Sequence, residues 1–330
     1  MSVKTNIRQC PLLRPFAVSH LTTTSVDVVG LTIAVPGCDA TGYGEIAADP
    51  GYAQDGAAIA AEGAGLAADL ASDPADPELR DLRRIEDRLD AAAETVSSAA
   101  RMLVEMAVLD RAARLDGGPV WRLLRLPEPG TVQLLATVPI GDPIPAYGPV
   151  KIKLGGPADV DVLRRLVDVS GPVVLDVNRG WNRDDWTRLR GLVQRVTPAV
   201  LEDPVSDVPG LLTEVRAALP NTAVVLDEGI DGPDDVERAA TTAGGANVKV
   251  MKLGGLFPAR RALQHLTHRC ATRMLGCYLE PPRAIAYAAQ LNGLADWTDL
   301  DGHFWLSADH PTVSKYKLDS SVPGVPSLAK

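Results

Sequence analysis

Three carboxylates in the second half of this 330-residue chain follow short apolar runs at nearly equal intervals: Asp176, Glu202 and Asp227. Each interval fits one strand plus one helix, and the strand ends of a closed barrel surround a single mouth. Oxygen ligands without histidine or cysteine are typical of Mg²⁺, which keeps further coordination positions for water and substrate. The spacing therefore predicts that these three side chains bind one magnesium ion per subunit.

Lysines occupy two of the neighbouring apolar runs. Alternation places Lys151 and Lys153 on one face of a strand, and Lys249 lies in the run that begins at Asn247. Single residues of this kind have a plainer interpretation, because an aspartate at a strand end commonly caps the next helix and a strand lysine commonly reaches solvent. Buried unpaired charges are costly, so a shared divalent cation is the natural partner. Three acids together with two lysine-bearing strands favour a functional site.

The composition excludes several classes of protein. Lys and Arg number 33 against 42 Asp and Glu, and the net charge of -9 does not suit binding to nucleic acid or to an anionic membrane surface. No signal-peptide segment and no apolar run of about 18 residues is present. The cysteines show no metal-type or redox-type pairing. We expect a cytoplasmic protein with free thiols, no nucleic-acid partner and no membrane association.

Short apolar runs alternate with amphipathic segments from about residue 132. Six runs predict buried parallel strands, at 150–154, 173–177, 199–201, 223–226, 247–251 and 274–278. Five segments between them predict helices, at 159–169, 184–196, 208–219, 234–243 and 258–268. This alternation favours a closed barrel. The connection at 137–150 is rich in proline and glycine, which predicts that the first outer helix is missing and that the bared wall needs cover.

The sequence pattern of the first part of the chain predicts a separate α+β unit. A strand is predicted at 26–35 and helices at 57–70, 79–89 and 95–115, the last ending at Asp116-Gly-Gly118. We expect the segment 313–330 to return and pack on this unit.

The ordered set of motifs resembles the enolase superfamily, in its muconate-lactonizing-enzyme-like subgroup. The motifs are Lys151-Ile-Lys153, Asp176-Val-Asn178, Glu202-Asp203, Asp227-Glu228 and Lys249-Val-Met-Lys252. The turn Gly42-Tyr-Gly-Glu45 and the segment 97–124 extend the resemblance over nearly the whole chain. It implies an α/β fold, a modified TIM barrel (β/α)7β with an α+β capping domain. The implied division is a capping domain at 1–118, joined by the tail 310–330, and a barrel domain at 119–309.

The resemblance also implies a role for each charged residue. Asp176, Glu202 and Asp227 would bind Mg²⁺, which stabilises the enediolate formed when the proton α to a carboxylate leaves. Lys153 and Lys249 would be the two bases on opposite faces of the substrate. Lys151 would keep the pKa of Lys153 low and help hold the substrate carboxylate. Asn178 and Lys252, which stand in the same motifs, are candidates for substrate binding.

The substrate group is indicated by the last strand. Asp299-Leu-Asp301 is similar to the strand-eight pair of the dipeptide epimerases, where two carboxylates receive a substrate ammonium; the alternative is a solvated turn. Glu280 and Arg283 stand where many of these enzymes have a Glu-Ser pair, and Arg283 could bind a second carboxylate or face solvent. Members that act on Ala-Glu tend to carry an arginine after the position of Phe16, and none is present here.

Four functions remain open at this point. The leading one is epimerisation of a dipeptide or another N-substituted amino acid, by an enzyme of the isomerase class. The same site would also serve a cycloisomerase or lyase, of the muconate cycloisomerase or o-succinylbenzoate synthase type. A metal-free Schiff-base barrel using Lys249 and a barrel without catalysis are the other two. In each enzymatic case the partner is a small carboxylate, and we expect a homo-oligomer.

Overall fold

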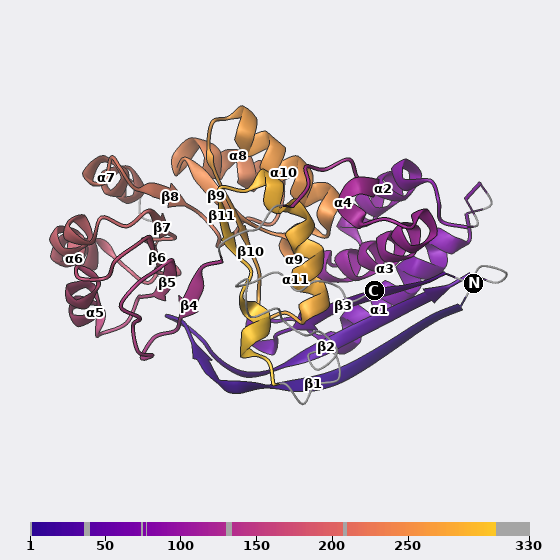
Figure 1. The fold of residues 1–330 in the computed structure, drawn as a ribbon, viewed down its shortest axis with the longest axis horizontal. Helices are drawn as coiled ribbons and strands as arrows, with labels where there is room; N and C mark the ends of the chain where they lie inside the picture. The colour runs from indigo at the N-terminus through magenta and orange to yellow at the C-terminus, as the bar shows by residue number, and fades with distance from the viewer. Residues whose placement is uncertain are drawn as a thin grey trace.

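The computed structural model describes residues 2–35, 40–73, 75–76, 78–129, 134–206 and 210–307. An antiparallel sheet with its helices lies beside a barrel of parallel strands, as Figure 1 shows. The predicted packing of segment 313–330 and Cys38 lie outside the described residues. No helix of the described part combines the length and the apolar composition that a membrane span requires.

The N-terminal sheet consists of three antiparallel strands in chain order: β1 (Ser2–Ala17), β2 (Thr22–Ala34) and β3 (Thr41–Ala48). The sequence did not predict β1, whose side chains are mostly exposed because it forms the edge of the sheet. The helices and turns that follow are η1 (Pro50–Tyr52), α1 (Gly56–Ala71), α2 (Leu82–Ala91), η2 (Ala92–Glu94), α3 (Ser98–Asp116) and α4 (Val120–Leu123). Helix α3 ends at Gly117, which adopts φ 70°. We call residues 2–118 the cap.

Eight parallel strands form the barrel. They are β4 (Ala136–Val138), β5 (Val150–Lys153), β6 (Val173–Asp176), β7 (Val200–Glu202), β8 (Ala223–Val225), β9 (Gly245–Lys249), β10 (Thr272–Gly276) and β11 (Trp297–Asp299). Strands β4 to β8 pair in order, and so do β9 to β11. A bridge between Leu226 and Ala246 joins the two sets, and the Leu135 amide donates to the Thr298 carbonyl at 3.1 Å to close the ring.

The outer helices confirm the expected missing element. Residues 139–149, all of them described, contain no helix between β4 and β5. The helices and turns present elsewhere are α5 (Asp159–Leu166), α6 (Arg183–Val196), α7 (Leu211–Ala218), α8 (Pro233–Thr242), α9 (Val250–Leu253), α10 (Leu256–His268), α11 (Pro282–Ala288), η3 (Ala289–Leu294) and η4 (Gly302–Trp305). The strand predicted at 247–251 ends at Lys249, because α9 begins at the next residue.

The apolar core is divided along the barrel. Residues 138–219, which we call the first barrel part, bury their own cluster between β5, β6, β7 and helices α5 to α7. Residues 224–300, the second barrel part, share one cluster with the cap. A small layer of five side chains fills the barrel interior: Leu135, Val174, Val200, Val225 and Met274. In Figure 1 the first part lies at one end of the molecule and the cap helices lie at the other, with the second part between them, while the cap strands β1 and β2 run along the bottom toward β4.

A buried carboxyl group ties the cap to the second barrel part. Glu105 of α3 accepts hydrogen bonds from the Leu256 amide and from the Tyr287 hydroxyl, the latter at 2.6 Å. Burial is the largest influence on this group and raises its pKa to about 7. Its neighbour Arg101 donates to the Leu253 carbonyl at 3.3 Å. Helix α3 is therefore fixed to α9, α10 and α11 by polar contacts as well as by the shared core.

Candidate active site

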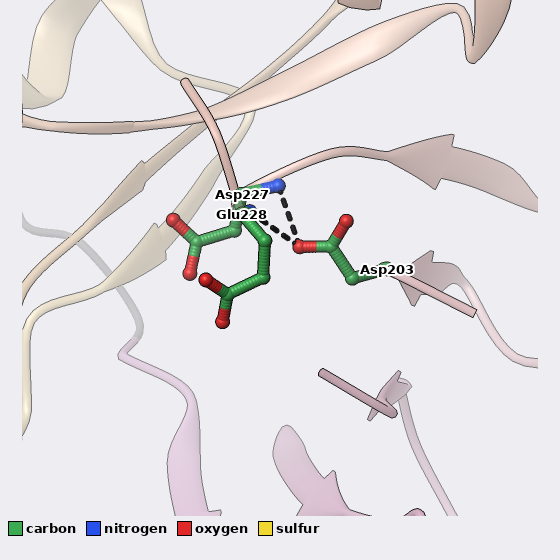
Figure 2. A group of neighbouring side chains, drawn as sticks. All are labelled: Asp203, Asp227 and Glu228. Atoms are coloured by element: carbon green, nitrogen blue, oxygen red, sulfur yellow. Dashed lines mark hydrogen bonds between the residues drawn. The ribbon is translucent and has the colours of Figure 1, made fainter. Parts of the chain in front are cut away.

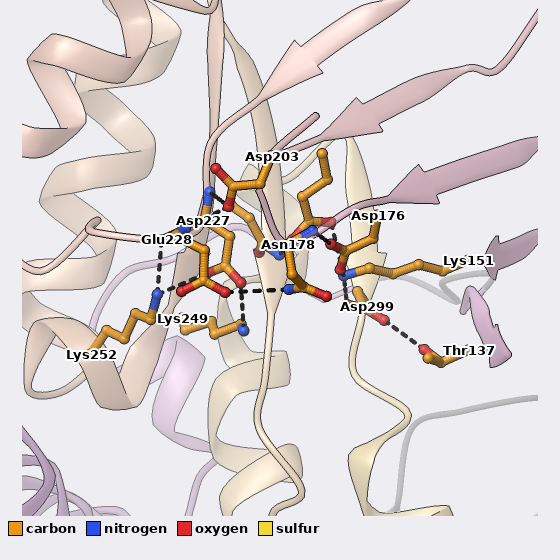
Figure 3. Close-up of polar contacts among 12 residues, drawn as sticks. Thr137, Lys151, Asp176, Asn178, Asp203, Asp227, Glu228, Lys249, Lys252 and Asp299 are labelled. Atoms are coloured by element: carbon orange, nitrogen blue, oxygen red, sulfur yellow. Dashed lines mark hydrogen bonds and ion pairs between the residues drawn. The ribbon is translucent and has the colours of Figure 1, made fainter. Parts of the chain in front are cut away.

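The predicted acids and lysines meet at the carboxyl ends of the barrel strands. Asp176 and Glu202 are the last residues of β6 and β7, and Asp227 follows β8 by two positions. Lys153 and Lys249 are the last residues of β5 and β9. All three carboxylates are at most 1% exposed. Figure 3 shows Asp176 beside Lys151, and Asp227 beside Lys249 and Lys252.

Lys151 joins acids from three strands. Its Nζ lies 3.0 Å from Asp176 Oδ2, 2.8 Å from Glu202 Oε2 and 2.6 Å from Asp299 Oδ2. Burial acts to lower the pKa of Lys151, but the three carboxylates outweigh it and hold the pKa well above its usual value. Lys153 Nζ also contacts Asp176 Oδ2 and lies 3.3 Å from Asn178 Oδ1. Lys151 is therefore an ammonium that balances buried negative charge.

Asp227 is held by the lysines of β9 and α9. Lys249 Nζ lies 2.6 Å from Asp227 Oδ2, and Lys252 Nζ lies 3.0 Å from Asp227 Oδ1. Burial acts to raise the pKa of Asp227, yet the lysines lower it far below its usual value. For Lys249 the opposite holds: burial acts against the charge, but Asp227 raises the pKa well above normal.

Glu202 is a fully buried carboxyl group beside the carboxylates of Asp176 and Asp227. Burial first, and then the charges of Asp176 and Asp227, raise the pKa of Glu202 to about 8. Its Oε1 accepts a hydrogen bond from Asn247 Nδ2 at 2.8 Å, which fixes the carboxylate. Buried hard oxygen donors that lie close together fit a divalent cation of the magnesium type.

The tightest acidic group differs from the predicted trio. Among the described residues, the carboxylates whose oxygens all lie within 4.8 Å of one another are Asp203, Asp227 and Glu228 (Figure 2). The physical reason is that Lys151 lies between Asp176 and Glu202, while two other lysines hold Asp227. Asp203 Oδ2 already accepts from the amides of Asp227 and Glu228, at 2.9 and 2.6 Å. Asp203 therefore fixes the turn after β8.

The two predicted bases border one pocket from opposite walls. Lys153 and Lys249 both line it. In the closed ring, β5 and β9 are separated by β6, β7 and β8 on one side and by β10, β11 and β4 on the other. An α-carbon bound between them would face an amine on each side. This arrangement suits removal of a proton from one face and its return on the other.

The acidic pair of the last strand borders the same pocket. Asp299 and Asp301 both line it and are 5% and 8% exposed. Thr137 of β4 joins them: its amide donates to Asp301 Oδ2 at 2.7 Å, and its hydroxyl lies 3.1 Å from Asp301 Oδ1 and 3.3 Å from Asp299 Oδ1. The alternative of a solvated turn therefore does not describe this buried pair.

Two other predicted substrate-binding residues are placed differently from each other. Glu280 is buried, and burial raises its pKa to about 8 while the charge of Lys249 lowers it. Arg283 lies away from the pocket, with its guanidinium 3.9 Å from an Asp110 oxygen and over the ring of Tyr43. Both of these partners belong to the cap. The structure therefore brings Glu280 close to the catalytic cluster and leaves Arg283 outside it.

Several residues of the site were missed by the sequence reasoning. Asn247 could have been found, because it alternates with Lys249 and so faces the same side of β9. Thr137 stands in the first barrel strand but carries no distinctive motif. Tyr52 and Tyr278 come from a turn and a strand-to-helix loop, and their rings meet edge to face at 5.2 Å. No periodicity places such loop residues.

Known proteins are similar to this chain in sequence and fold. A family described as Enolase C-terminal domain-like matches residues 145–320. The L-Lys-D/L-Arg epimerase of Methylococcus capsulatus is 31% identical over 254 residues, which are 69% of this chain and 68% of that protein. The hydrophobic dipeptide epimerase of Roseobacter litoralis is 28% identical over 307 residues, covering 86% and 85% of the two chains.

A solved structure gives the same result for the fold. The dipeptide epimerase of Methylococcus capsulatus, complexed with Mg and the dipeptide L-Arg-D-Lys, matches with a TM-score of 0.74 and 25% identity. The match covers 93% of this chain and 91% of that one. The family match, the capped barrel and the strand-end lysines and acids agree. The chain belongs to the enolase superfamily, where its relatives include the dipeptide epimerases.

Proposed function

We propose that this protein epimerises dipeptides, by removing the proton on the α-carbon next to the terminal carboxylate and returning it on the other face. The observation that carries the proposal is the placement of Lys153 and Lys249 on opposite walls of one pocket, beside the acidic pair of the last strand. The relatives named as dipeptide epimerases support it.

We propose that Asp176, Glu202 and Asp227 hold the Mg²⁺ ion. The support is the buried oxygen donor set, in which burial first and then the neighbouring carboxylates raise the pKa of Glu202. Magnesium, when bound, supplies positive charge that offsets the carboxylates and the charge that develops on the substrate carboxylate. Asn247 holds Glu202 in position, and Asp203 holds the turn that carries Asp227.

The lysines carry the proton in both directions. One lysine, as a neutral amine, takes the α-proton, and the other, as an ammonium, delivers a proton to the opposite face, so the overall proton balance is zero. Lys151, the ammonium between Asp176 and Glu202, supplies a permanent positive charge for the substrate carboxylate. Asp299 and Asp301 receive the substrate ammonium, because paired carboxylates form strong hydrogen bonds with a cationic amine.

Deuterium exchange tests this function. A library of dipeptides is incubated with the protein and Mg²⁺ in D₂O, and α-deuterium is followed by mass spectrometry and NMR. We expect exchange and inversion at a single α-carbon, with both lost on addition of EDTA. A protein of the cycloisomerase or lyase type would leave the library unexchanged and convert muconate or a succinylbenzoate precursor instead. Activity that survives EDTA and is trapped by borohydride would indicate a Schiff base on Lys249.

Other expectations from the sequence stay predictions. We infer that the division of the chain falls near residue 118, that the protein is a homo-oligomer and that it acts in the cytoplasm. The helix-free segment 139–149 supports an oligomer, because its aromatic residue Tyr147 is 75% exposed. Sedimentation of the intact protein measures the oligomeric state.

A further inference from the structure

The pocket has two chemically different walls. The charged side chains that line it all come from barrel strands or the residues after them: Lys151, Lys153, Lys249, Asp299 and Asp301. Apart from Thr23, the side chains that the cap contributes are apolar or aromatic, and residues after β10 and β11 continue this apolar surface. These residues are Phe16, Val18, Leu21, Tyr52, Tyr278, Leu279 and Trp305, and we call them the apolar wall. A bound substrate therefore meets charge on one side and hydrocarbon on the other.

The apolar wall begins beside one of the bases. Lys249 Nζ lies 4.6 Å from the centre of the Tyr278 ring, and Tyr278 packs edge to face on Tyr52. The proposed function places the reacting α-carbon between Lys249 and Lys153. Its side chain, attached directly to that carbon, is then the substrate group nearest to the two tyrosine rings. At the other end of the wall, Phe16 packs edge to face on Trp305, with ring centres 4.8 Å apart.

Two charged side chains near this wall, Arg14 and Asp49, are engaged with other groups. Arg14 lies over the Trp305 ring and forms an ion pair of 2.8 Å with Asp142, and it does not line the pocket. Asp49, buried behind Thr23, accepts from the Thr23 hydroxyl and from the Gly51 amide, both at 2.8 Å. Among the described residues that line the pocket, the apolar wall thus offers neither a cation for an acidic side chain nor a carboxylate for a basic one.

We propose, on the basis of the proposed function, that the epimerised residue of the substrate carries an uncharged apolar side chain, which packs on Tyr278, Tyr52, Phe16 and Leu21. An acidic or basic side chain at this position would be buried against hydrocarbon without a partner, which is strongly unfavourable. Family membership leaves this open, since one relative is named for hydrophobic dipeptides and another for Lys-Arg dipeptides.

A matched series of dipeptides tests the proposal with the intact protein and Mg²⁺. L-Ala-L-Met, L-Ala-L-Glu and L-Ala-L-Lys have side chains of similar length but different charge, and L-Ala-L-Leu adds a branched one. We expect kcat/KM for deuterium exchange to be at least about 100-fold higher for the Met and Leu dipeptides than for the charged ones. Exchange of the Glu or Lys dipeptide as fast as that of the Met dipeptide would overturn the proposal and leave the epimerase function standing. Absence of exchange with every dipeptide would overturn both.

A charge placed on the wall sharpens the test. Leu21→Arg should raise kcat/KM for L-Ala-L-Glu and lower it for L-Ala-L-Leu, so that the preference changes by about tenfold or more. The matched control is Ile7→Arg, which adds the same charge at a 41% exposed site of β1 outside the pocket. This control should keep the wild-type preference. An equal change of substrate preference in both variants would show that added charge alters the preference without contacting the apolar wall. This result would contradict the proposal that the substrate side chain packs on that wall. The wild-type series decides the proposal even if Leu21→Arg does not fold.

Discussion

The two parts of the barrel pack in different ways, although their strands form one ring. The first part buries a cluster of its own, whereas the second part and the cap form a single larger cluster. The residues that we propose for catalysis and metal binding come from both parts. Lys151, Lys153, Asp176 and Glu202 belong to the first part, and Asp227, Lys249 and Asp299 belong to the second.

Polar contacts cross between these two parts at the site itself. Lys151 of β5 pairs with Asp299 of β11, and Asn247 of β9 donates to Glu202 of β7. The hydrocarbon contacts that join the parts inside the ring are limited to a thin layer. The first part therefore supplies only charged side chains to the pocket. The second part supplies other charged side chains, and together with the cap it supplies the apolar wall that we propose selects the substrate.

The largest expected effect follows from removing the base that each part contributes. Lys153→Ala and Lys249→Ala should each lower the rate of epimerisation by about 10²–10⁴-fold, because each removes one of two proton carriers. Each variant should still exchange deuterium into one stereoisomer, and the two variants should retain opposite ones. NMR of the separated L,L and L,D dipeptides in D₂O measures this. Loss of exchange into the same stereoisomer in both variants would contradict the placement of the bases on opposite walls.

A second prediction tests the division of the core. Leu189→Ala in the first part and Leu103→Ala in the cap each create a cavity at a fully buried site, and each should lower the free energy of unfolding by about 2–5 kcal/mol. Hydrogen exchange should then differ. Leu189→Ala should speed amide exchange mainly within 150–219, whereas Leu103→Ala should speed it in both the cap and the second barrel part. Uniform acceleration over the whole chain in both variants would show that the clusters unfold as one.

A third prediction concerns the contact between cap and second part. The pKa of Glu105 is raised from 4.5 to about 7, so the folded protein binds this proton more tightly than the unfolded chain does. Its contribution to stability is therefore fully present below pH 4.5 and is lost as the pH rises to about 7. Between these limits the loss is on the order of 3 kcal/mol.

The variant Glu105→Gln removes the pH-dependent contribution of this residue to the free energy of unfolding, because the neutral amide does not titrate. Urea unfolding at pH 5 and pH 8 measures the change in stability for both proteins. The wild type should lose more stability than the variant over this interval. Parallel pH profiles would mean that Glu105 keeps its charge in the folded protein.

The smallest expected effect is at Arg283. Its guanidinium lies beside Asp110 and Tyr43 of the cap, so Arg283→Ala should change kcat/KM by less than about twofold and stability by at most about 1 kcal/mol. Initial rates of deuterium exchange measure the first quantity. A rise in KM of tenfold or more would return Arg283 to the substrate site.

The sequence predicted the site well where strand alternation applies. Lys151 and Lys153 share a face because they are two positions apart in β5, and the regular spacing of the acids follows from the repeat of strand and helix. The sequence predicted the site less well where a loop or a tertiary contact determines the position of a side chain. Nothing local shows that Lys151 lies between Asp176 and Glu202, that Arg283 lies against the cap, or that Tyr52 reaches Tyr278.

The fold was likewise predictable in part. Proline and glycine in 139–149 excluded a helix, and the structure agrees. The long edge strand β1 was missed because its exposed side chains show no alternation of apolar and polar residues. The end of β9 at Lys249 could not be read from the apolar run that continues into α9.

The separate packing of the two barrel parts has a consequence for the durability of the protein. Asp176 and Glu202 belong to the first barrel part and Asp227 belongs to the second, so an ion coordinated by all three would link the two parts. Because such an ion binds the folded state and not the unfolded chain, the Tm of the protein should rise with the concentration of the ion. The concentration of Mg²⁺ would then determine both the reaction rate of the enzyme and its thermal stability.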